Sequence, residues 1–349
     1  MSGKQALVTG ATGVVGRNLI RHLCGLPGWE VIAVSRRKPD IDGVRHLPLD
    51  LLDRGECAAK LGGLSGVTHL FHTAYIEFPS TADMCAPNLA MLANALEAVE
   101  PVARGLEHVH VVQGTKYYGS HLGPFKTPAK EDDPRHPPPN FYYDLQDYVT
   151  ARQRGKAWTW SAARPHSVIG FATGNPMNLS TVIAVYASIA RALGEPLAFP
   201  GGEGPYRALY QCTDAGLLAQ AMVWMATTPA CANEAFNITN GDLFRWQHVW
   251  PKFAEFFGVP LAPPRRIKLA QAMAQHEPVW NALAARHGLK PHRYADIVSW
   301  PFGDFVFAID YDVISDMGKA RRFGFCASLD SEQRFLEVFA GYRQAGIIP

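Results

Sequence analysis

The stretch VTGATGVVGRNL, residues 8–19, decides the fold. The apolar run at residues 5–9 predicts a strand, and residues 13–24 predict a helix. Glycines 10, 13 and 16 lie between the two, where a tight turn brings backbone N–H groups at a helix N-terminus close to phosphate. We therefore predict a dinucleotide-binding turn, with a purely structural tight turn as the alternative. Its residues are Thr9, Gly10, Thr12, Gly13, Val14 and Gly16.

Strand-like and helix-like patterns alternate through the first half of the chain. Strands are expected near residues 30–35, 44–49, 68–74, 108–114 and 159–165, and a long helix at 83–99. This rhythm predicts an α/β fold with a Rossmann-type doubly wound parallel sheet. The irregular, helix-rich remainder predicts a smaller, mostly helical substrate-binding lobe over the carboxyl edge of the sheet. The expected boundaries are 1–172 plus about 208–242 for the NADP-binding domain, and about 173–207 plus 243–349 for the lobe.

Composition excludes several classes of function. Apolar residues make up 48% of the 349 positions and charged ones 18%, which is typical of a soluble globular protein. The net charge of +2 does not favour nucleic-acid binding, and no apolar run approaches the ~20 residues of a membrane span. The six cysteines lack metal-ligand spacing and are expected to be free thiols, so no metal site is predicted. Absence of a signal-peptide pattern predicts a cytoplasmic protein, and the Ala- and Arg-rich composition is typical of bacteria.

The end of the second strand indicates which nucleotide binds. An NAD site usually has an acidic residue there, whereas this chain has Ser35, Arg36 and Arg37. Guanidinium groups can bind a 2′-phosphate bidentately, so we predict NADPH, with two solvated surface arginines as the alternative. Asp50 and Leu51, after the third strand, are expected at the adenine edge. Thr73 and Ala74, which end the fourth strand, are expected to border the same cleft.

The stretch PPNFYYDLQDYVT, residues 138–150, raises the question of the catalytic lysine. Short-chain reductases usually carry a lysine one helical turn after their tyrosine, on the same face. Here Gln146 follows Tyr142 at that spacing, and no lysine follows Tyr143 either. Lys116, in QGTKYYG at the end of the fifth strand, can reach the same cavity from another element. Tyr143 in place of Tyr142, and a plain surface role for Lys116, are the alternatives.

Several motifs together resemble one family. GTKYYG, NFYYDLQD, VSRR, WSAARPHSVIGF and EAFNITNGDLFRWQHVW look like the progesterone 5β-reductase and iridoid synthase family, a divergent branch of the extended short-chain dehydrogenases/reductases. The resemblance implies that Tyr142 and Lys116 are the catalytic pair. It also implies NADPH-dependent conjugate reduction of the activated C=C bond of enones or enals, including 3-oxo-Δ4-steroids such as progesterone. A homodimer is a further expectation.

The same resemblance suggests contact residues. Cofactor contacts are expected from Gln113, Tyr142, Pro165, Ser167 and Val168. Substrate-lining residues are expected to be Tyr75, Phe141, Met177 and Asn178, with Trp300 or Phe302 as a gate. Exposed aromatics in a hinged lid, or simple core packing, are alternative accounts of the last two residues.

Two other functions stay open at this point. One is a carbonyl reductase or nucleotide-sugar epimerase of the extended short-chain group, which Arg36, Arg37 and Gln146 disfavour. The other is a non-catalytic NADP-sensing regulator, which would be expected to lack both Tyr142 and Lys116. Fold alone does not separate these functions, because one doubly wound sheet supports many activities.

Overall fold

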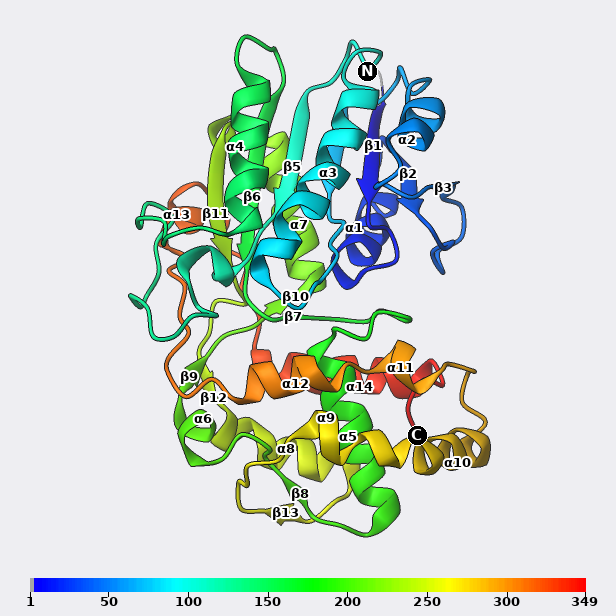
Figure 1. The fold of residues 1–349 in the computed structure, drawn as a ribbon, viewed down its shortest axis with the longest axis vertical. Coiled ribbons are helices and arrows are strands. Elements are labelled where there is room, and N and C mark those ends of the chain that lie inside the picture. The colour runs from blue at the N-terminus through cyan, green and yellow to red at the C-terminus, as the bar shows by residue number, and fades with distance from the viewer. Residues whose placement is uncertain (1–2) are drawn as a thin grey trace.

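A seven-stranded parallel sheet forms the centre of the upper lobe in the computed structural model, which describes residues 3–349 (Figure 1). The strand order is β11-β6-β5-β4-β1-β2-β3. The strands are β1 (Lys4–Thr9), β2 (Trp29–Ser35), β3 (Arg45–Pro48), β4 (His69–His72), β5 (His108–Val112), β6 (Thr159–Pro165) and β11 (Glu234–Ile238). Each strand expected in the first half is present, which confirms the Rossmann-type prediction.

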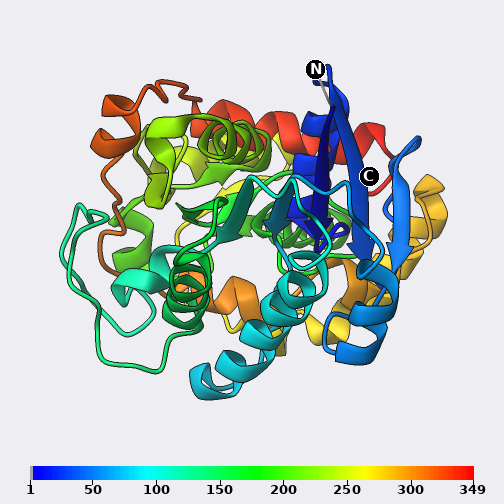
Figure 2. The same ribbon diagram turned by 90° about the horizontal axis from the view of Figure 1, so that it is seen from above.

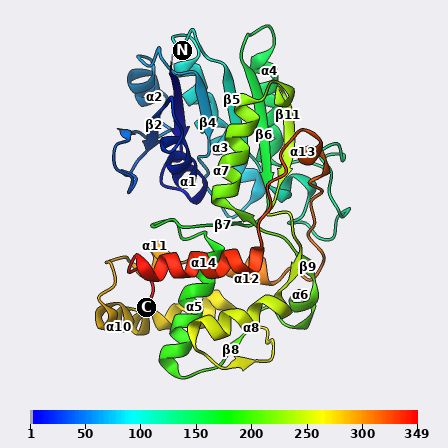
Figure 3. The same ribbon diagram turned by 180° about the vertical axis from the view of Figure 1, so that it is seen from behind.

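Helices cover both faces of the sheet. On one face lie α1 (Val14–Cys24) and α7 (Ala215–Thr227), which stand in front in Figure 3. On the other lie α2 (Arg54–Leu61), α3 (Thr81–Val99) and α4 (Phe141–Gln153), which lie below the sheet in the view from above of Figure 2. The sequence did not indicate α2, because only Cys57 and Leu61 of this short helix are buried and its apolar periodicity is therefore weak.

The lower lobe is mostly helical and packs around aromatic side chains, among them Trp246, Trp250 and Phe335. Its helices are α5 (Leu179–Leu193), α6 (Glu203–Arg207), α8 (Trp246–Phe257), α9 (Leu269–Ala272), α10 (Glu277–His287), α11 (Tyr294–Ile297), α12 (Trp300–Phe307) and α14 (Ser331–Gln344). Of these, α12 and α14 lie nearest the carboxyl ends of the sheet strands (Figure 1). Every helix among residues 3–349 is too short or too polar to cross a membrane.

Short strand pairs and single turns complete the fold. The pairs are β7 (Val168–Ile169) with β10 (Thr213–Asp214), β9 (Leu209–Tyr210) with β12 (Phe244–Arg245), and β8 (Leu197–Ala198) with β13 (Leu261–Ala262). The single-turn 3₁₀ helices are η1 (Thr115–Tyr118), η2 (Pro229–Cys231) and η3 (Ala274–His276). Of these, η1 directly follows β5, so it begins at the carboxyl edge of the sheet.

The predicted lobe boundary is wrong near the C-terminus. Residues 243–349 were assigned to the lower lobe, but α13 (Gly318–Arg322) packs against β11. Met317, Ala320 and Phe325 bury their side chains in the core of the upper lobe, and Lys319 Nζ lies 2.6 Å from a carboxylate oxygen of Glu234. Apolar spacing identifies residues that must be buried, but it does not say against which lobe.

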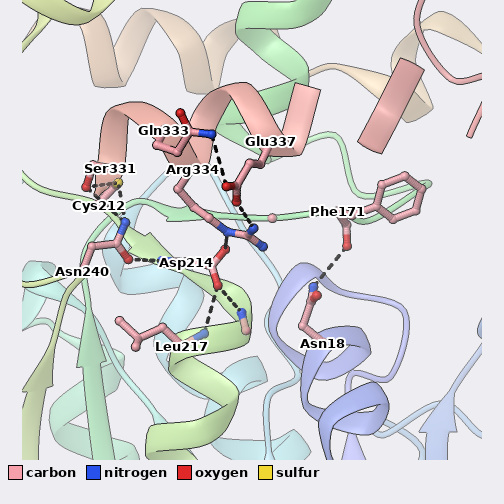
Figure 4. Close-up of polar contacts among 12 residues, drawn as sticks. Asn18, Phe171, Cys212, Asp214, Leu217, Asn240, Ser331, Gln333, Arg334 and Glu337 are labelled. Atoms are coloured by element: carbon pink, nitrogen blue, oxygen red, sulfur yellow. Dashed lines mark hydrogen bonds and ion pairs between the residues drawn. The ribbon is translucent and has the colours of Figure 1, made fainter. Parts of the chain in front are cut away.

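A polar network fastens α14 to the edge of the sheet (Figure 4). Asp214 caps α7 by accepting from the N–H groups of Gly216 and Leu217 through one oxygen, and its other oxygen accepts from Arg334 Nε at 2.7 Å. Asn240 accepts from the N–H of Asp214 at 2.6 Å and donates to Ser331 Oγ at 3.1 Å. The last long helix is therefore held against the start of α7.

Four histidines are buried inside the sheet, on β4 and β5. His72 Nδ1 lies 3.0 Å from Thr9 Oγ1, and Ser161 Oγ lies within 2.8 Å of both His108 and His110. Burial lowers the pKa of His72 to about 4 and of His110 to about 3, and burial followed by the charge of nearby Lys4 lowers the pKa of His69 to about 4. These side chains are thus neutral in the folded protein near neutral pH.

We expect the protein to lose stability in mild acid. The unfolded chain binds protons on these histidines below about pH 6.5, whereas the folded chain does so only near pH 4. His69 and His72 should therefore each cost about 3 kcal/mol of unfolding free energy by pH 4. Urea unfolding between pH 7.5 and 5 measures the slope. His72→Asn should flatten it and the exposed control His248→Gln should not; a pH-independent wild type would contradict the expectation.

Candidate active site

The chain leaves β5 through Gln113 and Gly114 and enters η1, which carries Lys116. A Cβ atom on Gly114 would lie 3.0 Å from Tyr142 Oη and 3.4 Å from the Pro165 carbonyl oxygen. Glycine therefore lets the phenol of α4 lie against the backbone that precedes Lys116. The close packing brings the carboxyl ends of β5 and β6 and the start of α4 to one point.

A single buried asparagine links the two predicted catalytic residues. Asn140 Oδ1 accepts the N–H of Tyr142 at 3.0 Å and so caps α4. Its Nδ2 donates to the carbonyl oxygen of Lys116 at 2.8 Å. His136 Nε2 lies 3.3 Å from the same carbonyl oxygen. The backbones of Lys116 and Tyr142 are therefore fixed relative to each other although they belong to different elements.

The position that usually holds the lysine has another use here. Gln146 Oε1 accepts from Arg164 Nη2 at 3.1 Å and from Gln113 Nε2 at 3.2 Å. Gln113 also donates to the carbonyl oxygen of Tyr142 at 2.9 Å and accepts from Arg164 Nε at 2.9 Å. The Gln113 amide is thus occupied by the buried guanidinium and by α4, and the cofactor contact at Gln113 stays a prediction.

The structure distinguishes the two neighbouring tyrosines. Tyr143 is buried, its hydroxyl donates to the Tyr117 carbonyl oxygen at 2.6 Å, and it accepts from the N–H of His136 at 3.1 Å. Tyr142 is half-buried, and no group among residues 3–349 is hydrogen-bonded to its hydroxyl. Burial, and after it the charge of Glu77, raises the pKa of Tyr142. Tyr142 therefore presents a protonated phenol that is free to donate.

Glu77 and Phe305 complete the surroundings of Lys116, and neither was predicted. Glu77 Oε1 lies 3.8 Å from Lys116 Nζ, which also lies 5.3 Å from the ring centroid of Phe305 on α12. Phe305 is three residues after Phe302, so helical spacing places the two on neighbouring positions of one face. Glu77 stands in an irregular segment after β4, where no periodic signal exists.

Tyr75 and Phe141 form a continuous aromatic wall with the phenol ring of Tyr142. Tyr75 is 40% exposed, and its ring centroid lies 5.6 Å from that of Phe141. Phe141 is buried, and its ring centroid lies 4.2 Å from that of Tyr142. Tyr75 and Tyr142 thus expose ring surface that Phe141 supports from behind. Tyr75 Oη donates to Met84 Sδ at 3.5 Å.

Two predicted substrate contacts belong to the core of the lower lobe instead. Asn178 is fully buried, caps α5 by accepting from the N–H of Ser180, and donates to the Gly170 carbonyl oxygen at 2.7 Å. Trp300 is 6% exposed and packs against Tyr294, beside a separate cavity of about 390 Å³. The predictions for Asn178 and for Trp300 as a gate are wrong, because both side chains point inward.

The other two predicted substrate residues are less buried. Phe302 is half-buried and packs against the core of the lower lobe. Met177 is half-buried in the segment between β7 and α5. The exposed aromatic of α12 is Phe305, 40% exposed, so the contact between this helix and the catalytic edge runs through Phe305.

The glycine-rich turn has the close approach that a dinucleotide site needs. A Cβ atom on Gly16 would lie 2.3 Å from the Gly10 carbonyl oxygen and 2.6 Å from Thr73 Oγ1. Gly13 is the N-cap residue of α1 and has no side chain that could accept a hydrogen bond. The N–H groups of the first turn of α1 therefore have no side-chain acceptor. Thr12 and Val14 lie in the same turn. The arrangement fits the pyrophosphate of a nicotinamide dinucleotide.

Several predicted cofactor residues use their side chains inside the protein. Thr9 is fully buried against His72, and Leu51 lies in the core, so the predicted cofactor contacts at these two positions, which stay predictions, would have to come from the backbone. Asp50 Oδ1 accepts from the N–H of Leu52 at 3.0 Å. Thr73 donates to the Thr9 carbonyl oxygen at 2.6 Å, and Ala74 follows it at the end of β4.

The second strand ends in a turn that presents two arginines. The Ser35 hydroxyl is buried and donates to the Arg37 carbonyl oxygen at 2.6 Å. Arg36 and Arg37 are exposed, and Arg37 Nη2 donates to the carbonyl oxygen of Gly174 at 2.6 Å. The segment that leads from the sheet into α5 therefore touches the end of β2.

The turn after β6 is the remaining predicted cofactor contact. The Pro165 carbonyl oxygen faces Gly114, and Val168 lies in β7. Ser167 has a positive φ of 33°, which is rare for a residue other than glycine, and its hydroxyl lies 2.6 Å from Tyr210 Oη. Backbone held in this region is commonly found at ligand sites.

Comparison with known proteins gives relatives along nearly the whole chain. The model of the PRISE-like Rossmann-fold domain matches residues 47–349. A 3-oxo-Delta(4,5)-steroid 5-beta-reductase of Arabidopsis thaliana is 32% identical over 99% of this chain and 93% of its own. An (S)-8-oxocitronellyl enol synthase of Catharanthus roseus is 32% identical over 99% and 92%. The UDP-glucose 4-epimerase of Thermotoga maritima, 18% identical over 97% of this chain and 99% of its own, superimposes with a TM-score of 0.70 and shares the fold.

We expect Gly16→Ala to destabilise the nucleotide turn. The added methyl group would overlap the Gly10 carbonyl oxygen and Thr73 Oγ1, so α1 must move away from β4. Overpacking of this kind costs about 1–3 kcal/mol of unfolding free energy, which urea denaturation measures. Gly105→Ala is the control, since a Cβ atom there meets nothing within 4 Å. Equal stability of the two variants would contradict the close packing.

Proposed function

Because the chain belongs to the PRISE-like Rossmann-fold family, we propose that it is an NADPH-dependent reductase of the activated C=C bond of enones or enals. One observation carries the proposal. Asn140 fastens the backbone of Tyr142, whose phenol is free, to the backbone of Lys116 at the carboxyl edge of the sheet. Both side chains also have Glu77 as a neighbour.

These two side chains suit conjugate addition. A dihydronicotinamide held at the glycine-rich turn would supply a hydride to the β-carbon, and negative charge would then develop on the carbonyl oxygen of the substrate. Tyr142 donates a hydrogen bond to that oxygen, and Lys116 stabilises the resulting enolate electrostatically. The phenol can donate because burial, followed by Glu77, raises the pKa of Tyr142 and keeps it protonated. The α-carbon takes its proton from water.

The surroundings favour an apolar carbon skeleton. The exposed ring surfaces of Tyr75 and Phe305 flank the catalytic edge, with Phe141 behind Tyr75. Two relatives are named for a 3-oxo-Δ4,5-steroid and for 8-oxocitronellyl enol. We therefore propose an enone or enal as substrate, with 3-oxo-Δ4-steroids such as progesterone included in the class.

The alternatives are less well supported. The likeness to an epimerase concerns the fold alone, and the relatives with the higher identity are a steroid reductase and an enol synthase. The helical position that an epimerase would use for its lysine is Gln146, which is bound to Arg164. A non-catalytic NADP sensor has no need of the Tyr142–Asn140–Lys116 arrangement. The cytoplasmic location, bacterial origin and homodimer stay predictions.

NADPH rather than NADH is the proposed reductant. Arg36 and Arg37 are exposed at the end of β2, next to the glycine-rich turn. Residues 35–38, which follow the strand, include no carboxylate that would repel a 2′-phosphate. Arg37 already donates to the Gly174 carbonyl oxygen, so its guanidinium points toward the segment between β7 and α5. A 2′-phosphate would replace that carbonyl oxygen as acceptor or share the guanidinium with it.

Tyr142→Phe and Lys116→Met should each reduce kcat with 2-cyclohexen-1-one strongly. Loss of one donor to a developing oxyanion costs about 3–4 kcal/mol, or a factor of 10² to 10³. Oxidation of NADPH gives the rate, and identification of the product shows whether the C=C or the C=O bond was reduced. Tyr143→Phe, whose hydroxyl is used inside the protein, is the control for folding and activity. An allylic alcohol as product would refute conjugate reduction.

Arg37→Ala should weaken the preference for NADPH. A charge-assisted hydrogen bond contributes about 1.5–3 kcal/mol, so kcat/KM for NADPH should fall about ten- to a hundredfold while that for NADH changes little. Lys38→Ala, an exposed neighbour, is the matched control. If the ratio of the two cofactors is the same in both variants, Arg37 does not recognise the 2′-phosphate.

A further inference from the structure

Glu77 is the one carboxylate that the structure places beside Lys116 within residues 3–349, and its only part in the proposed reaction is to help raise the pKa of Tyr142. It follows Tyr75 by two residues, so it lies at the end of the aromatic wall. Its side chain is 41% exposed and that of Lys116 is 27% exposed, so both charged groups are partly accessible to solvent. A carboxylate here must therefore affect which substrates can approach.

The other groups near this pair leave it electrically balanced. Burial raises the pKa of both Tyr75 and Tyr142, and the charge of Glu77 raises both further, for Tyr75 after the effect of Tyr142. His121 is near Lys116, and burial, followed by the charge of Lys116, lowers the pKa of His121 to about 4. From α12 the neighbour is the uncharged ring of Phe305. One cation and one anion are thus partly exposed at this edge of the sheet.

We propose that Glu77 sets the charge specificity of the site, so that neutral enones are admitted and enones with a carboxylate near the reacting carbonyl are rejected. This inference rests on the proposed function. Without Glu77, the partly exposed ammonium of Lys116 would attract anions to the catalytic edge. The carboxylate of Glu77 cancels this attraction by the Lys116 ammonium. A substrate that carries a carboxylate is then repelled by the like charge of Glu77. At separations of about 6–8 Å and intermediate dielectric, such repulsion corresponds to roughly a tenfold loss of kcat/KM.

A matched pair of substrates tests the inference. Benzoylacrylate and its methyl ester share the enone and differ in charge, so the quantity to measure is the ratio of kcat/KM for ester over acid. Glu77→Gln should lower this ratio about tenfold, mainly by improving the acid. Glu77→Asp keeps the charge and should keep most of the ratio. Glu203→Gln, an exposed residue of α6 paired with Arg207, is the control and should leave the ratio unchanged.

A binding measurement separates failure of this inference from failure of the proposed function. The saturated products, 4-oxo-4-phenylbutanoate and its methyl ester, are titrated calorimetrically into protein loaded with NADP⁺. Glu77→Gln should tighten the acid about tenfold relative to the ester, whether or not turnover occurs. A shifted binding ratio without enone reduction would overturn the proposed function alone. An equal loss of kcat for both substrates and an unchanged binding ratio would overturn the inference, because Glu77 would then only position Lys116.

Discussion

The buried guanidinium of Arg164 is the constraint on which the catalytic edge depends. The side chain is 1% exposed, and its carbon centre lies 3.4 Å from the ring centroid of Tyr117. A charge this deep is tolerated only when its donors are satisfied. The acceptors are Gln113 Oε1, Tyr118 Oη, the Glu131 carbonyl oxygen and Gln146 Oε1. Through them, β6 holds β5, η1 and α4 in one arrangement.

This constraint explains why the lysine is not on α4. An ammonium at position 146 would face a buried guanidinium and would offer donors where acceptors are needed. A glutamine supplies the acceptor, and the positive charge for the reaction comes instead from η1. Arg164 contacts the ring of Tyr117 and donates to the hydroxyl of Tyr118, and both tyrosines belong to η1. These contacts hold the backbone of Lys116 in place, as the contacts of Gln113 and Asn140 hold that of Tyr142. The usual short-chain reductase and this protein therefore differ in the element that carries the lysine, which is the helix of the tyrosine in the former and η1 here.

The sequence predicted the elements well and the directions of single side chains less well. The glycine turn and the strand rhythm identify the sheet, because these patterns follow directly from backbone geometry and burial. Gln113, Asn178 and Trp300 were placed at the right edge or helix, but their side chains point into the protein. Whether a residue near a site faces a ligand or the core depends on tertiary partners such as Arg164 and Tyr342, which local patterns do not show. Glu77 lies in an irregular segment and gave no signal at all.

The edge strand β11 has a consequence for synthesis of the protein. It pairs with β6, although residues 166–233, including α5 of the other lobe, come between them in the chain. On the ribosome, a nascent chain that has completed six strands therefore keeps the edge of β6 open until residue 238 has emerged. Open strand edges are templates for pairing with other chains. A fragment that ends near residue 172 would consequently aggregate rather than fold as an independent nucleotide-binding domain.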